Sequence, residues 1–448
     1  MHIIGIETQG LGTNNQMRGV VMSGAKQRKK GEKVPVSRES LIKASDGTIL
    51  HPKNFASQNE FKQAVQASVN NYLERNSAPE FVILPYDHAN GENENKDVDA
   101  LSLALKKAFE KHNHHIKTMV MASNLYDYQN VDLIHVGKHL LSQKDEEILK
   151  TTPALKAKTV ETLGVPSNIS WSLIKNLAHL PPTEKILEKY DTFKKVLGGN
   201  LLYGKDAAIE KNRDKKNVLF SLGGITDNGA IGFDLKDAEK LFISAVALTD
   251  MGYNVIFTNS LRTPSDVTNY LFEKCQEFNN RKENLKDKAP SFYKRYKNCS
   301  MEFFNSKKIA QNDEEAKNFR NYSGKYKAEF EKQAVEIGNI YPGVLDVCEF
   351  VINTHDSFSY TSDAAALGIP SVVYTGNFID KERRPDCYKL FDLCHKKGYA
   401  VSLDEALEKI EHGKELKTKK MDDVSTQLVK AMAKSLDNTR HLSDIKTR

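Results

Sequence analysis

The segment of the sequence with the clearest chemistry is rich in hydroxyl groups and lies between two short apolar runs, 350–352 and 371–374. Asp356 or Ser357 can cap a short helix that runs to about Ala366, and Gly368 can end it. N–H groups and hydroxyls at a helix N-terminus favour an anion, phosphate above all. The segment therefore predicts a phosphate site; the alternative is that these residues only cap a helix, as in any α/β domain. The hydroxyls belong to Thr354, Ser357, Ser359, Thr361 and Ser362.

Two more loops and one carboxylate suit the same ligand. A glycine pair follows the apolar run 217–221 and lets the backbone approach a diphosphate. Arg262 follows the run 254–258, and its guanidinium can clamp phosphate through two hydrogen bonds. Asp363 can accept hydrogen bonds from vicinal ribose hydroxyls, although an exposed helix aspartate is equally ordinary. The predicted nucleotide- and phosphate-binding residues are Gly223, Gly224, Ser260, Arg262, Thr263, Asp356, Ser357, Ser359 and Asp363.

The first half of the chain offers two candidate ligand loops. A glycine-bearing turn at 7–16 follows the apolar strand at 2–6, and Pro85–His88 follows a second strand at 80–84. The turn does not read G-x-G-x-x-G, and no acidic residue follows it at the right distance in a second strand. A dinucleotide site is therefore disfavoured.

Hydrophobic patterning predicts two successive series of alternating strands and helices. In the first series, strands are expected at 2–6, 80–84, 117–122 and 131–136, and helices at 61–73 and 97–109. In the second, strands are expected at 217–221, 254–258, 300–304, 350–352 and 371–374. Asp234 and Gly252 bound a helix, Ser402 and Glu405 form a capping box, and 424–436 is amphipathic. Because helices that join strands make the strands parallel, the predicted fold is α/β, with two Rossmann-like parallel-sheet domains facing a cleft.

The predicted domains are an N-terminal α/β domain at 1–182, a helical linker at 183–216, a C-terminal nucleotide-binding α/β domain at 217–402 and C-terminal helices at 403–448. The linker ends in the charge run 211–216. The segment 306–332 is an insert, either a helical hairpin packed on the domain or an acceptor-binding arm. Ligands of open α/β sheets bind outside the carboxyl ends of the strands, so the candidate loops are expected at the cleft.

Composition excludes several classes of protein. The chain has 448 residues, 39% hydrophobic and 28% charged, with a mean hydropathy of −0.54, which is typical of a globular protein with more than one domain. No apolar run approaches the roughly 20 residues of a membrane span, and the N-terminus does not resemble a secretory signal. A cytoplasmic protein is therefore expected. Five cysteines without metal-type spacing predict reduced thiols and no zinc site.

The charge pattern says little about partners. The net charge is +6, from 65 Lys and Arg against 59 Asp and Glu, which is not a nucleic-acid-binding signature. The basic cluster 26–33 is either a solvated loop or a contact with an anionic membrane surface, at which the protein would be peripheral.

These loops, in this order, resemble those of glycosyltransferases with the two-domain GT-B architecture. More narrowly, the chain resembles the fission-protein family known from plant elongated-mitochondria mutants and its bacterial relatives. Ser260–Pro264 matches that family's Ser-Arg-Arg-Thr-Pro. Thr354–Ala364 matches its Thr-x-Asp-Ser-x-Ser-Met-x-Ser-Glu-Ala, with Tyr360 for the Met and Asp363 for the Glu.

Three weaker matches follow the family's order. The first loop matches with Glu7 and Val20 in place of an Asp and a Leu, through Gly12, Asn15, Gln16 and Gly19. The strand 131–136 with His139 resembles a Phe-Asp strand that leads to His-Asp, and 159–166 resembles an Asn-Val-x-x-x-x-Gly turn. The family's Gly-Arg-Arg after the second strand is replaced by Pro85–His88, and the insert and the tail after about residue 400 have no counterpart.

The resemblance implies an enzyme that transfers a sugar from a nucleotide-sugar donor, UDP-linked by analogy, to an acceptor. The first domain would hold the acceptor, with Gly12, Asn15 and Gln16 in its loop. Helix dipoles, hydroxyls and an arginine would stabilise the departing diphosphate, so neither a metal nor another cofactor is expected. An acceptor hydroxyl also needs a base, for which Asp87, His88 and Glu7 are candidates by position; each is otherwise an ordinary loop residue.

The alternative is a non-catalytic GT-B-like scaffold of the same family that acts through membrane or protein partners. The hydroxyls of Ser357 and Ser359 and the charge of Arg262 favour ligand binding. The lack of an evident base favours the scaffold.

Overall fold

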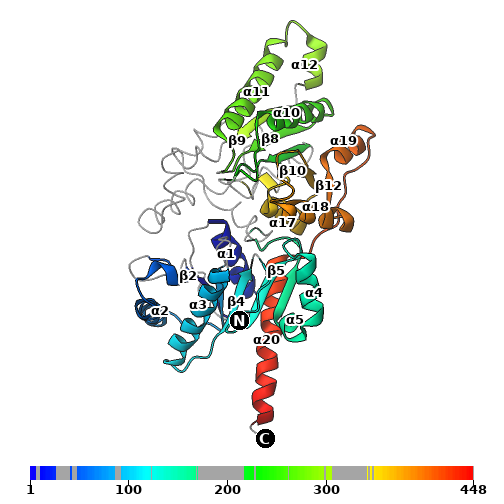
Figure 1. The fold of residues 1–448 in the computed structure, drawn as a ribbon. Helices are drawn as coiled ribbons and strands as arrows, with labels where there is room; N and C mark the ends of the chain where they lie inside the picture. Colours follow the sequence, from blue (N-terminus) through cyan, green and yellow to red (C-terminus); the bar gives the residue numbers. More distant parts are fainter. Residues whose placement is uncertain are drawn as a thin grey trace. The chain divides into compact units, whose positions relative to one another are not determined.

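A computed structural model of the protein describes residues 1–6, 11–26, 41–42, 48–85, 92–122, 124–167, 169, 216–226, 229–260, 262–296, 299–304, 341, 344–345 and 348–446. The chain forms two compact α/β units, each with its own sheet (Figure 1). The described residues of the first unit come from Met1–Asn168 and Asp422–Arg448, and those of the second from Ile169–Phe319 and Lys325–Met421. Every strand pairing in both sheets is parallel, which confirms the predicted fold class of two parallel-sheet domains.

Two predicted segments lie outside the described residues. They are the linker 183–216, except for Lys216, and the insert 306–332. The predicted domain boundaries therefore stay predictions.

The first unit is a six-stranded sheet in the order β2-β1-β3-β4-β5-β6, covered by helices. Its strands are β1 (Ile3–Ile6), β2 (Leu41–Ile42), β3 (Phe81–Pro85), β4 (Lys117–Ala122), β5 (Leu133–Gly137) and β6 (Thr159–Thr162). Its helices are α1 (Leu11–Lys26), the short 3-10 helix η1 (Pro52–Asn54), α2 (Gln58–Leu73), α3 (Glu92–Glu110), α4 (Gln143–Thr151), α5 (Pro153–Lys158) and α20 (Val424–Lys446). The segment 159–162, expected from the resemblance to be part of a turn, is the edge strand β6.

Alternation along β3 shows how the sheet divides the core of this unit. Val82 and Leu84 face one cluster, which includes side chains of α2 and α3, whereas Phe81 and Ile83 face a second, which includes side chains of α1 and α20. Successive side chains of a strand point to opposite faces, so a continuous apolar run is what a strand covered on both faces requires.

The last helix of the chain belongs to the first unit. Val424, Leu428 and Met432 of α20 are buried in the second of these clusters, and Lys117 on β4 donates hydrogen bonds to the carbonyl and the hydroxyl of Ser435. α19 (Leu403–Glu411), by contrast, packs in the second unit.

The acceptor-side loop expected at Gly12, Asn15 and Gln16 is wrong in its local structure, because all three residues lie in the helix α1. Glycine in a helix costs only about 1 kcal/mol relative to alanine. Burial of Met17 and Val20 against the sheet outweighs that cost, so packing decides for the helix.

The second unit is a six-stranded sheet in the order β12-β11-β10-β7-β8-β9. Its strands are β7 (Asn217–Ser221), β8 (Asn254–Thr258), β9 (Met301–Phe304), β10 (Cys348–Thr354), β11 (Ser371–Tyr374) and β12 (Ala400–Ser402). Its helices are α10 (Leu235–Asp250), α11 (Ser265–Asn284), α12 (Pro290–Tyr296), α17 (Phe358–Leu367), α18 (Pro385–Lys397) and α19. β8 and β9 lie on one side of β7, and β10, β11 and β12 lie on the other. This is the strand order of a Rossmann fold.

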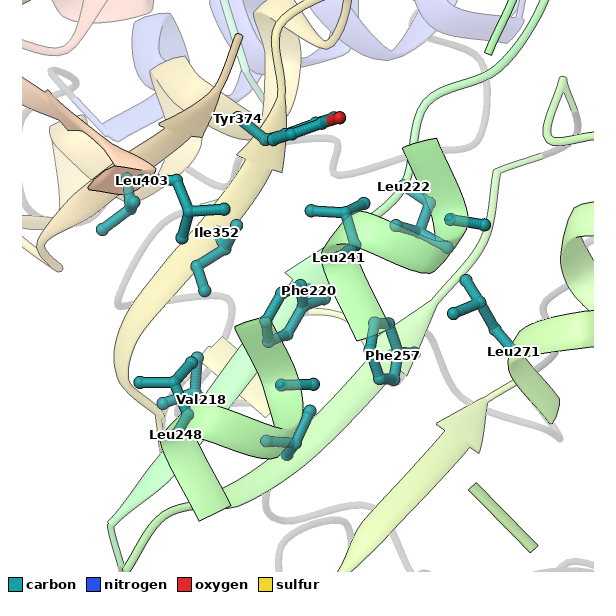
Figure 2. Packing of buried hydrophobic residues seen from close by; sticks show 14 of the residues in the cluster. Val218, Phe220, Leu222, Leu241, Leu248, Phe257, Leu271, Ile352, Tyr374 and Leu403 are labelled. Atoms are coloured by element: carbon teal, nitrogen blue, oxygen red, sulfur yellow. The ribbon is translucent and has the colours of Figure 1, made fainter. Parts of the chain in front are cut away.

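The core of the second unit lies between the sheet and its helices. Figure 2 shows Val218 and Phe220 of β7 in one cluster with Leu241 and Leu248 of α10, and with Phe257 of β8. The predicted helix signals are present as well: Asp234 caps α10, Gly252 ends its turn with a φ of +91°, and Ser402 and Glu405 form the capping box of α19.

Candidate functional site

The candidate site lies in the second unit, where the direction of strand order reverses. β7 and β10 are neighbours, but the chain leaves them toward opposite edges of the sheet. The loop after β7 holds Gly223 and Gly224; β10 ends at Thr354, and His355–Ser357 follow it. A reversal of this kind separates the loops at the carboxyl ends of the two strands, and ligands of open α/β sheets commonly bind there.

The glycine pair packs against the protein itself. The Gly223 N–H donates to Thr354 Oγ1 at 2.7 Å, and the Gly224 N–H donates to Asp356 Oδ2 at 3.1 Å. A Cβ on Gly223 would overlap the Asp356 carboxylate, and one on Gly224 would overlap the Arg262 carbonyl. The glycines therefore allow close approach of two neighbouring loops, rather than the expected approach of bare backbone N–H groups to a phosphate.

Arg262 and Asp356 form an ion pair at the centre of the site. Arg262 Nη2 lies 2.8 Å from Asp356 Oδ2. The Asp356 side chain is completely buried, whereas 40% of the Arg262 side chain is exposed. The carboxylate thus anchors one edge of the guanidinium and leaves part of it at the surface.

Ser260 and Thr263 shape the loop that carries Arg262. Ser260 Oγ donates to the Gly223 carbonyl at 3.1 Å and lies 3.3 Å from the Arg262 N–H, which it accepts. Thr263 Oγ1 accepts the Ser260 N–H and donates to the Gly223 carbonyl. Both hydroxyls are therefore engaged in joining the loop after β8 to the loop after β7.

The N-terminus of α17 lies beside the Arg262–Asp356 ion pair. Ser357 occupies the cap position, but its side chain makes no cap hydrogen bond. The carboxylate of Asp356 bonds to Gly224 and Arg262 instead, so the expected capping by Asp356 or Ser357 is wrong. Ser357 Oγ lies 3.5 Å from Thr354 Oγ1, and Ser359 is exposed in the first turn. The positive end of the helix dipole therefore lies next to the ion pair.

Asp363 lies away from the surface of the site. It is 5% exposed on α17, and its charge acts on the half-buried Tyr341 and Tyr360. Burial raises the pKa of Tyr360 to about 12, with the charge of Asp363 as a further cause. The exposed aspartate of the alternative interpretation is therefore wrong, and the ribose contact stays a prediction.

A second arginine–aspartate pair borders the site, and sequence reasoning missed it. Arg384 Nε and Nη2 donate to the carboxylate of Asp386 at 2.8–3.2 Å, and the guanidinium lies 5.7 Å from the centre of the Phe358 ring at the start of α17. Burial raises the pKa of the Cys387 thiol to about 12, and the charges of both arginines and both aspartates act on that thiol. Both arginine–aspartate pairs therefore lie near the Cys387 thiol. The signal in the sequence was Arg384 directly before Pro385, since proline favours the first turn of a helix.

The predicted catalytic residues of the first half, Glu7, Asp87 and His88, lie outside the described residues. They follow β1 and β3, the neighbouring strands at which the first sheet reverses its order. β3 ends at Pro85, so Asp87 and His88 come two and three residues after it in the sequence. That position suits a ligand loop.

In the described part of the chain, every helix is too short or too polar to span a bilayer. No group of three or more His, Cys, Asp or Glu residues in the same ranges could hold a metal ion.

Comparison with known proteins gives structural neighbours at low similarity. No family model matches the chain, and no curated protein matches it. A UDP-GlcNAc 2-epimerase of Methanocaldococcus jannaschii, solved with UDP-GlcNAc and UDP, is 11% identical with a TM-score of 0.36, and the match covers 98% of each chain. A mutant O-GlcNAc transferase of Thermobaculum terrenum is 11% identical with a TM-score of 0.27, over 83% of this chain and 61% of that one. The resemblance to the mitochondrial fission family stays a prediction.

Proposed function

We propose that the second unit binds the diphosphate of a nucleotide sugar, and that the protein transfers the sugar to an acceptor. The observation that carries the proposal is the position of Arg262: it is partly exposed and paired with Asp356, directly before the N-terminus of α17, at the reversal between β7 and β10. A guanidinium and a helix dipole are both suited to the oxygens of a diphosphate.

In the proposed reaction the residues of the two units have different tasks. A base from the first unit, for which Glu7, Asp87 and His88 remain the candidates, removes the proton of the acceptor hydroxyl as the oxygen attacks the anomeric carbon. The bond from that carbon to the diphosphate breaks. Arg262 and the N-terminus of α17 stabilise the charge that develops on the departing diphosphate.

The proposal requires that the protein bind nucleoside diphosphates without an acceptor. A ligand that binds only the folded state stabilises it by about 2.7 kcal/mol at a hundredfold excess over Kd. We expect one of the uridine, guanosine, cytidine and thymidine diphosphates to raise the melting temperature, and we expect it to be uridine diphosphate because of the resemblance described above.

Arg262→Lys tests the assignment of the residue. Replacement by alanine would leave the Asp356 carboxylate buried without its cation and would lower stability as well. Lysine keeps the charge but loses the planar pair of donors, so we expect Kd to rise roughly tenfold in calorimetry, about 1.4 kcal/mol. Arg281→Lys on the exposed side of α11 is the matched control. Equal affinity in both variants would refute the assignment.

A specific observation favours a second candidate, a scaffold without catalysis. The N–H groups of Gly223, Gly224 and Ile225 all donate to protein atoms, and Arg262 is already paired. The three loops therefore hold together without a ligand. The absence of any thermal shift with all four nucleotides at millimolar concentration would select this candidate.

A further inference from the structure

Asp356 has an unusual environment for an acidic residue in an anion site. Its side chain is completely buried, and Oδ2 accepts hydrogen bonds from the Gly224 N–H and from Arg262 Nη2. Oδ1 lies against Gly223, where a Cβ would overlap it. The backbone of the loop after β7 thus fixes the carboxylate, and the carboxylate fixes one edge of Arg262.

The charge of Asp356 opposes the binding of any anion at Arg262. A buried carboxylate 2.8 Å from a guanidinium nitrogen cancels much of its charge for a ligand that approaches from the surface. The neighbouring pair is similar, because the Arg384 Nε–H is shared between both oxygens of Asp386 and Nη2 donates to one of them. The charge of Asp356 also acts on Arg384. The formal charges of the two arginines and the two aspartates together sum to zero.

We infer that Asp356 is a positioning residue that orients Arg262 and, by neutralising it, limits the affinity of the site for a nucleoside diphosphate. A guanidinium has five N–H donors, of which one bonds to Asp356, so the others remain for phosphate oxygens. Binding then depends on short hydrogen bonds from a correctly oriented Arg262 rather than on long-range electrostatic attraction. The inference rests on the proposed function. It explains why an acidic residue lies inside the loop that was expected to hold phosphate.

The test separates position from charge by two substitutions at one site. Asp356→Asn keeps an oxygen that can accept from Gly224 and Arg262 but removes the negative charge. We expect it to bind uridine diphosphate roughly tenfold more tightly than the wild type at low salt, with an affinity that falls more steeply as salt rises, since salt screens the charge that is gained. Asp356→Ala removes the anchor as well, so we expect it to bind more weakly than Asp356→Asn.

The control is Asp287→Asn, which removes one exposed negative charge from the same unit outside the site. We expect it to leave both affinity and salt dependence unchanged. Equal affinity and equal salt dependence in the wild type and Asp356→Asn would overturn the inference. So would an Asp356→Asn protein that binds as weakly as Asp356→Ala, because the carboxylate would then contribute to binding.

The wild type provides a measurement that needs no variant. Neutralisation of Arg262 by Asp356 predicts that Kd for uridine diphosphate changes by less than about threefold between low and high salt. A change of tenfold or more would overturn the inference even if Asp356→Asn failed to fold. If neither the wild type nor Asp356→Asn binds any nucleoside diphosphate, the proposed function itself fails. Binding by the wild type with a steep salt dependence refutes only the role of Asp356.

Discussion

At the scale of single residues, a buried imidazole makes the stability of the first unit depend on pH. His135 on β5 is buried beside His139, and Nε2 lies 2.8 Å from Thr162 Oγ1. Burial, with the neighbouring His139 as a smaller cause, lowers its pKa from 6.5 to about 3. His135 is therefore neutral in the folded protein at pH values at which it becomes charged in the unfolded chain.

The sign of the pH effect follows from that difference. Above pH 6.5 the imidazole is neutral in both states, and its contribution to stability is constant. As the pH falls from 6.5 toward 3, only the unfolded chain binds the proton, so the folded state loses stability. At 1.36 kcal/mol per pH unit, the loss is about 2 kcal/mol between pH 6.5 and pH 5.

Urea unfolding followed by amide hydrogen exchange in β4 and β5 would measure this loss. His135→Gln removes the titrating group, and we expect its stability to vary less with pH than that of the wild type. His114→Gln, an exposed imidazole of the same unit, is the control and should follow the wild type. Parallel curves for the wild type and His135→Gln would contradict the prediction.

The candidate site shows why some residue roles could not be predicted from the sequence. The residue types of Arg262 and Asp356 identified them as members of one site, but both were expected to face the ligand. Their ion pair joins positions 94 residues apart, and no local pattern indicates it. Arg384 was missed for a related reason: it lies ten residues after the end of β11, and only the fold brings it near Asp356.

At the scale of elements, the loop after β7 depends on the loops that pack against it. A Cβ on Gly224 would overlap the backbone carbonyl of Arg262, which cannot move without its whole loop. We expect Gly224→Ala to lower the free energy of unfolding of the second unit by about 1–3 kcal/mol. It should weaken nucleotide binding too, because Arg262 would be displaced.

Gly232→Ala is the matched control in the same connection between β7 and α10. Its Cβ would lie 3.9 Å from the Phe378 carbonyl, an ordinary contact, so we expect a change within about 0.5 kcal/mol. Denaturant unfolding of both variants compares them directly. A Gly224→Ala protein as stable as Gly232→Ala would show that the loops are not packed as described.

Elements with strong apolar runs were predicted, and those without them were not. The central strands β3, β4, β7, β8 and β10 are buried on both faces, and such burial requires the continuous apolar runs that the sequence displays. β2 and β12 have two and three residues, too few for a pattern. The first turns of α1 were missed because Gly12 suggests a turn, whereas the apolar side chains described as buried on this helix, Met17 and Val20, come later in it.

At the scale of the whole molecule, the two units do not follow the order of the chain. α20 comes after the second unit in sequence but fills the core of the first. Leu428 on this helix is fully buried, so we expect Leu428→Ala to lower the stability of the first unit by about 2–5 kcal/mol. The second unit should keep its stability.

Hydrogen exchange distinguishes the two units in one experiment. We expect faster exchange in β1, β3 and β4 of the Leu428→Ala protein, and unchanged exchange in β7, β8 and β10. Lys430→Ala on the exposed side of α20 is the control. Equal losses of protection in both sheets would mean that the units unfold together.

The placement of α20 also sets the order of events during synthesis. The first unit ends its long segment at Asn168, and α20 begins at Val424. At about 5–20 residues per second, a ribosome needs roughly ten to fifty seconds to make the chain between them. Throughout that interval Ile3, Met17 and Phe81 lack the helix that covers them in the finished protein. The domain that is synthesised first is therefore the last to be completed. A chain that ends before α20 leaves this part of its apolar core uncovered.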